Sequence, residues 1–195
     1  PAKRVLKTGG YDIEAIALSF WPRHELGIVP YNAEAIELHD FDRDGTPEIY
    51  VACLGGKNLL YRIVKDSQGR AAIQAAANDF GGGHGYGFGD INGDGRDDIV
   101  NQSGWWEQPD RNIFEKPWKL HPECALPVMA ACPFVITKLT DSGRSDIIWG
   151  KAHDYGIYWR EQGVPKPDGT TTWTEHLIDD TWSQVHAMVW TDIDG

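Results

Sequence analysis

A nine-residue motif that recurs at a nearly constant spacing constrains this chain more than any other feature. Asp40–Glu48 and Asp90–Asp98 carry acidic or amide side chains at their first, third, fifth and ninth positions, and a glycine at the sixth. A third copy, Lys138–Asp146, keeps the glycine and the final carboxylate, and a fourth begins at Asp192. The copies start 50, 48 and 54 residues apart. Repetition at such a period predicts an architecture of stacked, similar units.

Each period contains four short segments with strand character, separated by turns rich in Gly, Asn, Asp and Pro. The predicted strands are 33–38, 48–52, 58–64 and 71–77, then 84–88, 98–101, 105–107 and 118–122, then 133–137, 146–149, 156–161 and 173–178, and finally 186–190. Four-stranded units of this kind are the blades of an all-β propeller. We therefore expect one domain of about three and a half blades, namely 1–32 (irregular or a partial blade), 33–82, 83–130, 131–184 and 185–195.

Composition restricts the partners. The net charge of −11 argues against nucleic acid as a partner. The sequence contains no apolar run of about 18 residues, so no membrane insertion is expected. Three cysteines give no disulfide framework, and no signal peptide is visible in the printed chain.

The motif itself predicts a loop around a hard cation such as Ca²⁺, because alternate side chains of an extended chain point the same way and offer oxygen ligands. The expected ligands are Asp40, Asp42, Asp44, Glu48 and the Thr46 carbonyl in the first loop, and Asp90, Asn92, Asp94, Asp98 and the Arg96 carbonyl in the second. The alternative is an acidic surface turn. We expect a structural role for these two ions, because clustered carboxylates repel one another until they are neutralised.

The third and fourth copies depart from the pattern. Lys138, Thr140 and Ser142 replace the acceptors of the third loop, so we expect it to be metal-free, with Lys138 paired to Asp141 or Asp146. The fourth loop offers Asp192 and Asp194 and then ends at Gly195, so it is expected to be empty or disordered.

Counting back six residues from each loop gives a second register. It contains Glu34, His84, Cys132 and His186. The strand that enters each loop is the innermost of a blade, so these side chains are expected to meet at one mouth of the central channel. They are ligand types for Zn²⁺ or another transition metal, or an acid–base set for a polar substrate. The alternative is that each packs at a blade interface.

The turns that return to the same mouth supply further candidates. They include 55–57, 102–104, 151–155, 81–83 and 180–183, which contribute Lys57, Gln102, Trp105, Lys151, His153, Asp154, Tyr155 and Trp182. Among these, His153 and Tyr155 are candidate catalytic residues, and Trp105, Lys151 and Trp182 are candidates for binding a carbohydrate, since aromatic faces stack on sugars. Trp118, Trp173 and Trp190 are assigned to packing.

The stretch Phe88-Gly89 followed by Asp-Ile-Asn-Gly-Asp-Gly-Arg-Asp-Asp-Ile resembles an FG-GAP/VCBS repeat, over roughly residues 33–195. The resemblance implies a propeller of about seven or eight blades with cation loops between the first and second strands of each blade. It also implies an extracellular or periplasmic location.

A fainter resemblance concerns chemistry. His84 and the stretch His186–Gly195 are similar to the propeller part of aldos-2-ulose dehydratase-like proteins. That likeness implies a lyase or dehydratase acting on a sugar, in which a base removes a proton next to a carbonyl beside a metal; His84 or His186 would be the base or a ligand. The alternative is a non-catalytic, integrin-like propeller module that binds a protein or a glycan.

Overall fold

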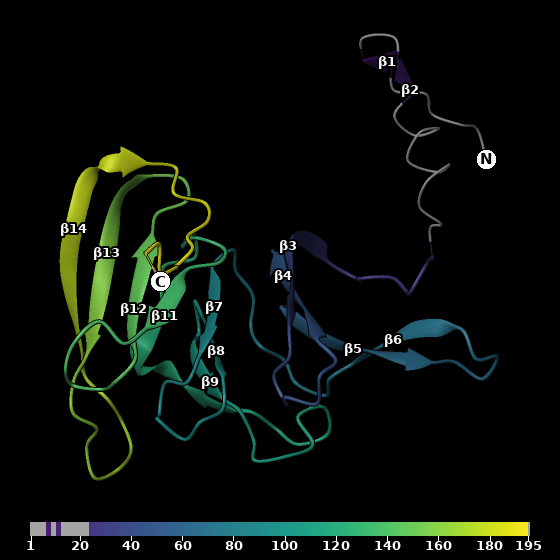
Figure 1. Cartoon of the computed structure of the whole chain (residues 1–195), viewed down its shortest axis with the longest axis horizontal. Helices are drawn as coiled ribbons and strands as arrows, with labels where there is room; N and C mark the ends of the chain where they lie inside the picture. Colours follow the sequence, from purple (N-terminus) through teal and green to yellow (C-terminus); the bar gives the residue numbers. More distant parts are fainter. Residues whose placement is uncertain (1–6, 9–10, 13–23, 195) are drawn as a thin grey trace.

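The computed structural model of the chain describes residues 7–8, 11–12 and 24–194 (Figure 1). These residues form three four-stranded antiparallel sheets, a short hairpin of β1 (Lys7–Thr8) and β2 (Tyr11–Asp12), and one 3₁₀ turn, η1 (Pro122–Cys124). None of their helical segments has the length and apolar content that a membrane crossing requires. The prediction for 1–32 falls mostly outside the described residues.

Each sheet is a meander in which neighbouring strands follow one another along the chain. The strands are β3 (Asn32–His39), β4 (Glu48–Leu54), β5 (Leu59–Lys65) and β6 (Ala71–Ala75), then β7 (Tyr86–Gly89), β8 (Asp98–Asn101), β9 (Gly104–Glu107) and β10 (Lys119–His121), then β11 (Val135–Thr137), β12 (Asp146–Gly150), β13 (Tyr155–Gln162) and β14 (Trp173–Ser183). The first three motif loops each join the first strand of a sheet to the second. The prediction of an all-β, partial propeller is confirmed.

The middle sheet is covered on both faces. All four residues of β8 are buried, because successive side chains of a strand point to opposite faces. Ile99 packs with Tyr50 and Leu60 of the first sheet, whereas Val100 packs with Ile147 of the third. The hydrophobic core therefore forms layers between blades. Figure 1 shows the three sheets that enclose them.

The strand β7 meets its two neighbours with different faces. Tyr86 and Phe88 point toward the first sheet, where the Tyr86 ring lies 5.1 Å from that of Tyr50. On the opposite face, a Cβ added to Gly87 or Gly89 would come within 2.6 Å of a side chain of β11 or of the residue before it. Glycine at these alternate positions is what lets the third sheet approach so closely.

A repeated hydrogen-bonded clasp joins neighbouring blades on the loop side. The Nε2 amide of Gln108 donates to the Phe41 carbonyl, and that of Gln162 donates to the Ile91 carbonyl, both at 2.9 Å. The main-chain N–H of each glutamine also donates to the last carboxylate of its own blade's loop. Each clasp thus fixes a loop against the following blade.

Two predicted elements are wrong. Residues 186–190 form no strand, because an entering strand needs the strand after its loop as a partner and residues 24–194 hold none for it. The main chain of this segment instead bonds to the residues that lead into β11, and the His186 carbonyl accepts the Cys132 N–H at 2.7 Å. Residues 180–183 are not a turn, because β14 continues to Ser183, which pairs with Tyr155 across a bulge.

We expect Gly87→Ala to lower the free energy of unfolding by about 2 kcal/mol, since the new methyl group overpacks the Phe134 ring. Urea denaturation followed by tryptophan fluorescence measures the change. Gln68→Ala, on the exposed turn between β5 and β6, is the control. An unchanged midpoint for Gly87→Ala would contradict the close packing of these strands.

Candidate functional site

The first two motif loops share one conformation. In each, the first carboxylate accepts main-chain N–H bonds from the fifth and sixth residues, at 3.0–3.1 Å in the first loop and 2.9–3.0 Å in the second. The glycines at the sixth position have φ of +88° and +87°, a region that residues with a Cβ rarely adopt. The loop geometry thus follows from the motif.

The first loop gathers its carboxylates. Oxygen atoms of Asp40, Asp42 and Glu48 all lie within 4.8 Å of one another. Burial raises the pKa of Glu48 to about 7, and the neighbouring aspartates add to the rise although the Phe41 N–H opposes it. Burial also raises the pKa of Asp42, and the charge of Asp44 contributes. This set of crowded oxygens fits a hard cation such as Ca²⁺.

The second loop is arranged differently. Asp98 is fully buried, and its two oxygens accept the N–H groups of Ile91 at 3.0 Å and Gln108 at 2.9 Å. Burial raises the pKa of Asp98 to about 7. Asp94 pairs with the guanidinium of Arg96, and among the described residues the acids of this loop form no three-membered cluster within 4.8 Å. Calcium binding here stays a prediction.

The third loop uses hydroxyls where the others use carboxylates, with Ser142 N donating to Thr140 Oγ1 at 3.4 Å. The expected pairing of Lys138 is wrong: its side chain is exposed, and no ion pair within residues 24–194 joins it to Asp141 or Asp146. Asp146 instead accepts the Gln162 N–H at 2.9 Å, so its role is to hold the clasp. In the fourth loop Asp194 N donates to Asp192 at 3.2 Å.

The second register brings its four side chains together. His84 Nε2 lies 3.7 Å from Glu34 Oε2 and 3.6 Å from Cys132 Sγ, and its ring centre is 5.7 Å from that of His186. His153, from the turn between β12 and β13, completes a group in which His84, His153 and His186 offer ring nitrogens within 4.8 Å of one another. We call these three residues the trihistidine cluster.

The orientation of two of these rings is fixed by main-chain carbonyls. His84 Nδ1 lies 2.8 Å from the Ala130 carbonyl, and His186 Nδ1 lies 3.0 Å from the Gln184 carbonyl. Because a carbonyl only accepts, each Nδ1 donates a hydrogen bond to it, and in the neutral ring Nε2 then presents a lone pair. Histidines that bind metals are oriented in this way by a second hydrogen bond. His84 is buried, whereas His153 and His186 are exposed, so the cluster opens to solvent on one side.

The sequence predicts that His153 lies at the same channel mouth as the other two histidines. It does not place His153 at an equivalent position in each blade, because the turn that carries it differs in length between blades. The two orienting carbonyls were missed altogether, and no sequence signal identifies them.

One aromatic predicted to bind and one predicted to pack occupy other places. Trp105 is buried and stacks on His121 with ring centres 3.8 Å apart, so it cannot bind substrate as predicted. Trp190, assigned to packing, is exposed, because no strand forms over 186–190 to cover it. Trp182 and Tyr155 are exposed, and Trp118 is buried as predicted.

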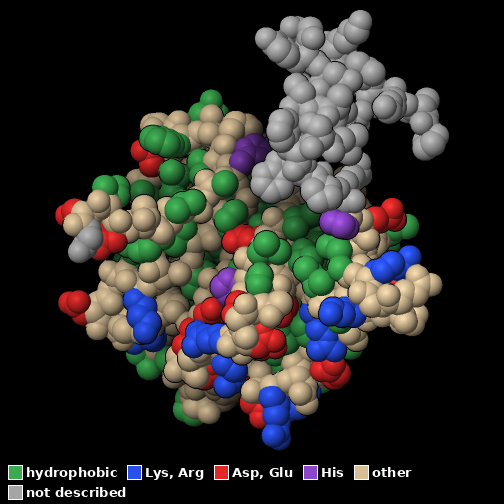
Figure 2. All heavy atoms as spheres, turned by 45° about the vertical axis from the view of Figure 1, so that its right-hand side comes forward, with side chains coloured by type: hydrophobic (Ala, Val, Ile, Leu, Met, Phe, Trp, Pro, Cys, Tyr) green, Lys and Arg blue, Asp and Glu red, His purple; other side chains and the backbone are tan. Residues whose placement is uncertain are grey.

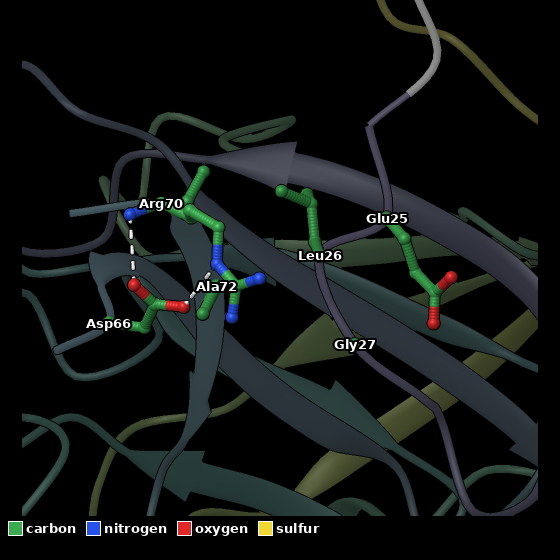
Figure 3. A pocket seen from close by; sticks show the side chains of 7 residues that line it. Glu25, Leu26, Gly27, Asp66, Arg70 and Ala72 are labelled. Carbon is green, nitrogen blue, oxygen red and sulfur yellow. Dashed lines mark hydrogen bonds and ion pairs between the residues drawn. The ribbon is translucent and has the colours of Figure 1, made fainter. Parts of the chain in front are cut away.

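A pocket of about 380 Å³ shares no lining residue with the trihistidine cluster and lies between 25–27 and the turn that joins β5 to β6. Figure 3 shows its lining residues. It is lined by Glu25, Leu26, Gly27, Asp66, Arg70, Ala71 and Ala72. Asp66 and Arg70 form an ion pair of 2.8 Å, so the charges in its wall satisfy each other. Its lining holds no histidine or cysteine and offers no chemistry comparable to the trihistidine cluster.

Acidic and basic side chains are intermixed on the face drawn in Figure 2, with hydrophobic side chains between them. The excess of acidic residues therefore forms no continuous single-sign patch on that face.

Fold and site together define a class: a propeller assembled from repeats with a motif loop in each blade. Residues 19–100 match the family model of the FG-GAP-like repeat, which is consistent with the FG-GAP repeat family that the loop motif predicted. Comparisons with curated proteins and with solved structures find no match.

We expect Ca²⁺ to raise the melting temperature of protein stripped with EGTA, because the ion neutralises the carboxylates of the first loop. The double variant Asp40→Asn, Asp42→Asn should lose most of this response. Thr140→Ala in the third loop is the control and should respond like the wild type. An unchanged melting temperature of the wild type would refute the cation-loop assignment.

The raised pKa values predict a pH dependence in EGTA. The unfolded chain releases the Glu48 proton near its ordinary pKa of 4.5, whereas the folded chain releases it near 7. Raising the pH from 4 to 8 therefore favours the unfolded state, and stability should fall over this interval. Glu48→Gln should flatten the fall, since the amide still accepts the Phe41 N–H. Thermal melts across this pH range test the prediction, and an equally steep fall in the variant would contradict it.

Proposed function

We propose that this chain is the FG-GAP-like propeller part of a carbohydrate-active protein, with a transition metal at the trihistidine cluster as its functional centre. The single observation that carries the proposal is that His84, His153 and His186 offer ring nitrogens within 4.8 Å of one another. They come from segments that are far apart in the sequence, so their meeting is not a local consequence of one turn.

The donor set suits a divalent transition metal. Imidazole is a common ligand of zinc, and three protein ligands leave a coordination position for substrate or water. The carbonyl-held Nδ1–H groups of His84 and His186 support the assignment of Nε2 as their ligand atom.

When bound, such an ion acts as a Lewis acid on a carbonyl oxygen. The reaction class that we propose is carbon–oxygen elimination from a sugar: a proton leaves the carbon next to the carbonyl, the C–O bond one carbon further breaks, and the departing oxygen takes up a proton. Glu34 lies 3.7 Å from His84 Nε2 and is partly exposed, which suits it to hold the transferred proton. If one histidine leaves the metal, His84 or His186 can serve as the base instead.

The motif loops have a separate role in this proposal. Calcium in the first loop, and in the second, stabilises the blades without taking part in the reaction. Exposed loops of this kind suit the calcium concentrations outside cells, which supports an extracellular or periplasmic location.

A second candidate function is a non-catalytic module that binds a protein or a glycan on the loop side. A cleft of about 390 Å³ between the first and second loops favours it. The cleft is lined by charges of both signs, contributed by Asp42, Arg43, Asp44, Arg96, Asp110 and Arg111.

Metal analysis separates the two functions. Protein loaded with Zn²⁺ and dialysed should retain about one equivalent, and His84→Ala or His186→Ala should lose it. His176→Ala, outside the cluster, is the matched control and should keep the metal. If the wild type retains calcium but no zinc, the proposed centre is refuted and the binding module is favoured.

The reaction class has its own test. Zinc-loaded protein incubated with keto sugars should generate the ultraviolet absorbance of an unsaturated carbonyl product, and His186→Ala should not. If the metal is retained but no product forms from any substrate of this class, the elimination reaction is wrong.

A further inference from the structure

A second cavity shares a wall with the trihistidine cluster. Its volume is about 310 Å³, and its lining consists of Pro127, Val128, Met129, Lys151, His153 and Asp154. His153 belongs to both the cavity and the cluster, so a molecule in the cavity lies beside the residues that are proposed to hold the metal.

The walls of the cavity are hydrogen-bonded to the segments that carry the other two histidines. On one side, the Val128 carbonyl accepts the main-chain N–H of His84 at 3.2 Å. On the other side, the Lys151 carbonyl accepts Val185 N, and the Asp154 carbonyl accepts Gln184 N, both at 3.2 Å. These bonds keep cavity and cluster in a fixed relation, as a subsite and its reactive centre require.

The two walls differ in chemistry. Pro127, Val128 and Met129 form an apolar side, suited to the C–H face of a sugar ring. Opposite them, the ammonium group of Lys151 lies 3.4 Å from an Asp154 carboxylate that is 67% exposed. A surface ion pair of this kind contributes little. The ammonium group also lies 5.4 Å from the centre of the Tyr158 ring, a contact that brings no negative charge, so Lys151 can pair with a ligand carboxylate.

The charge of the centre favours the same kind of ligand. Three neutral imidazoles do not offset the charge of a divalent ion, and the two carboxylates nearby, Glu34 and Asp154, are outnumbered by the charges of the ion and Lys151. Together with Lys151, the loaded site therefore attracts an anion locally although the whole chain is acidic. The cavity is at the small end of the range for ligand pockets, which favours one sugar unit over a polymer segment.

We propose that this cavity is a substrate subsite that selects a monosaccharide-sized sugar acid. Its carboxylate pairs with Lys151, its C–H face lies on Val128 and Met129, and its carbonyl or hydroxyl end points to the trihistidine cluster. The inference rests on the proposed metal centre and adds the substrate class that the centre accepts.

Calorimetric titration of zinc-loaded protein with D-glucuronate and with D-glucose tests the subsite. Glucuronate should bind about tenfold more tightly than glucose, as expected for a charge-assisted contact. Lys151→Met should remove this preference with zinc content unchanged, and Lys151→Arg should retain it. Lys119→Met, which removes an exposed lysine paired with Glu107, is the matched control and should behave like the wild type.

A second variant tests the apolar wall. Val128→Asp places a carboxylate in the cavity. It should weaken the binding of glucuronate more than the binding of glucose, with zinc content unchanged. If zinc binds but the two sugars bind equally or not at all, the subsite is wrong and the metal centre stands. A preference that survives in Lys151→Met also overturns the subsite, because the ion alone would then select the anion. If zinc is not retained by the wild type, the proposed function itself fails.

Discussion

The close approach of the first strands of the second and third sheets is the constraint on which the rest of the structure depends. Gly87 and Gly89 leave no side chain between β7 and the chain at Phe134 and Ile136, so the two blades meet almost backbone to side chain. The opposite face of β7 carries Tyr86 and Phe88 into the layer shared with the first sheet. The strand β7 thereby sets a short distance to the third sheet and a longer one to the first sheet. Because of the short distance, the segments that lead into the second and third blades lie close together.

Convergence is what creates the candidate site. His84 stands two residues before β7, where the narrow spacing brings it near both Cys132 and the segment that carries His186. At the loop ends of the same two blades, the glutamine clasp from Gln162 to Ile91 holds the second loop against the third sheet. The blades thus keep the loop carboxylates at one end and the imidazoles at the other, so the proposed calcium loops and the proposed metal centre draw on different residues.

Much of this followed from local sequence signals. The period, the four strands of three blades and the positions of the first three motif loops were predicted, because strand patterns and turn residues act over a few neighbours. Counting back six residues found Glu34, His84, Cys132 and His186. The tryptophans were harder to place: Trp105 and Trp190 were both misassigned, since burial depends on whether a neighbouring blade or a paired strand covers the ring.

The sequence by itself determined which residues recur at equivalent positions, and hence that a carboxylate, two imidazoles and a thiol stand at one end of successive blades. Only the tertiary structure decided that His153 joins them, that carbonyls of Ala130 and Gln184 orient two rings, and that the first loop gathers its acids while Asp98 of the second turns inward. The reason is physical: a repeat fixes equivalent positions within each blade, whereas contacts between blades depend on the distances at which their layers pack.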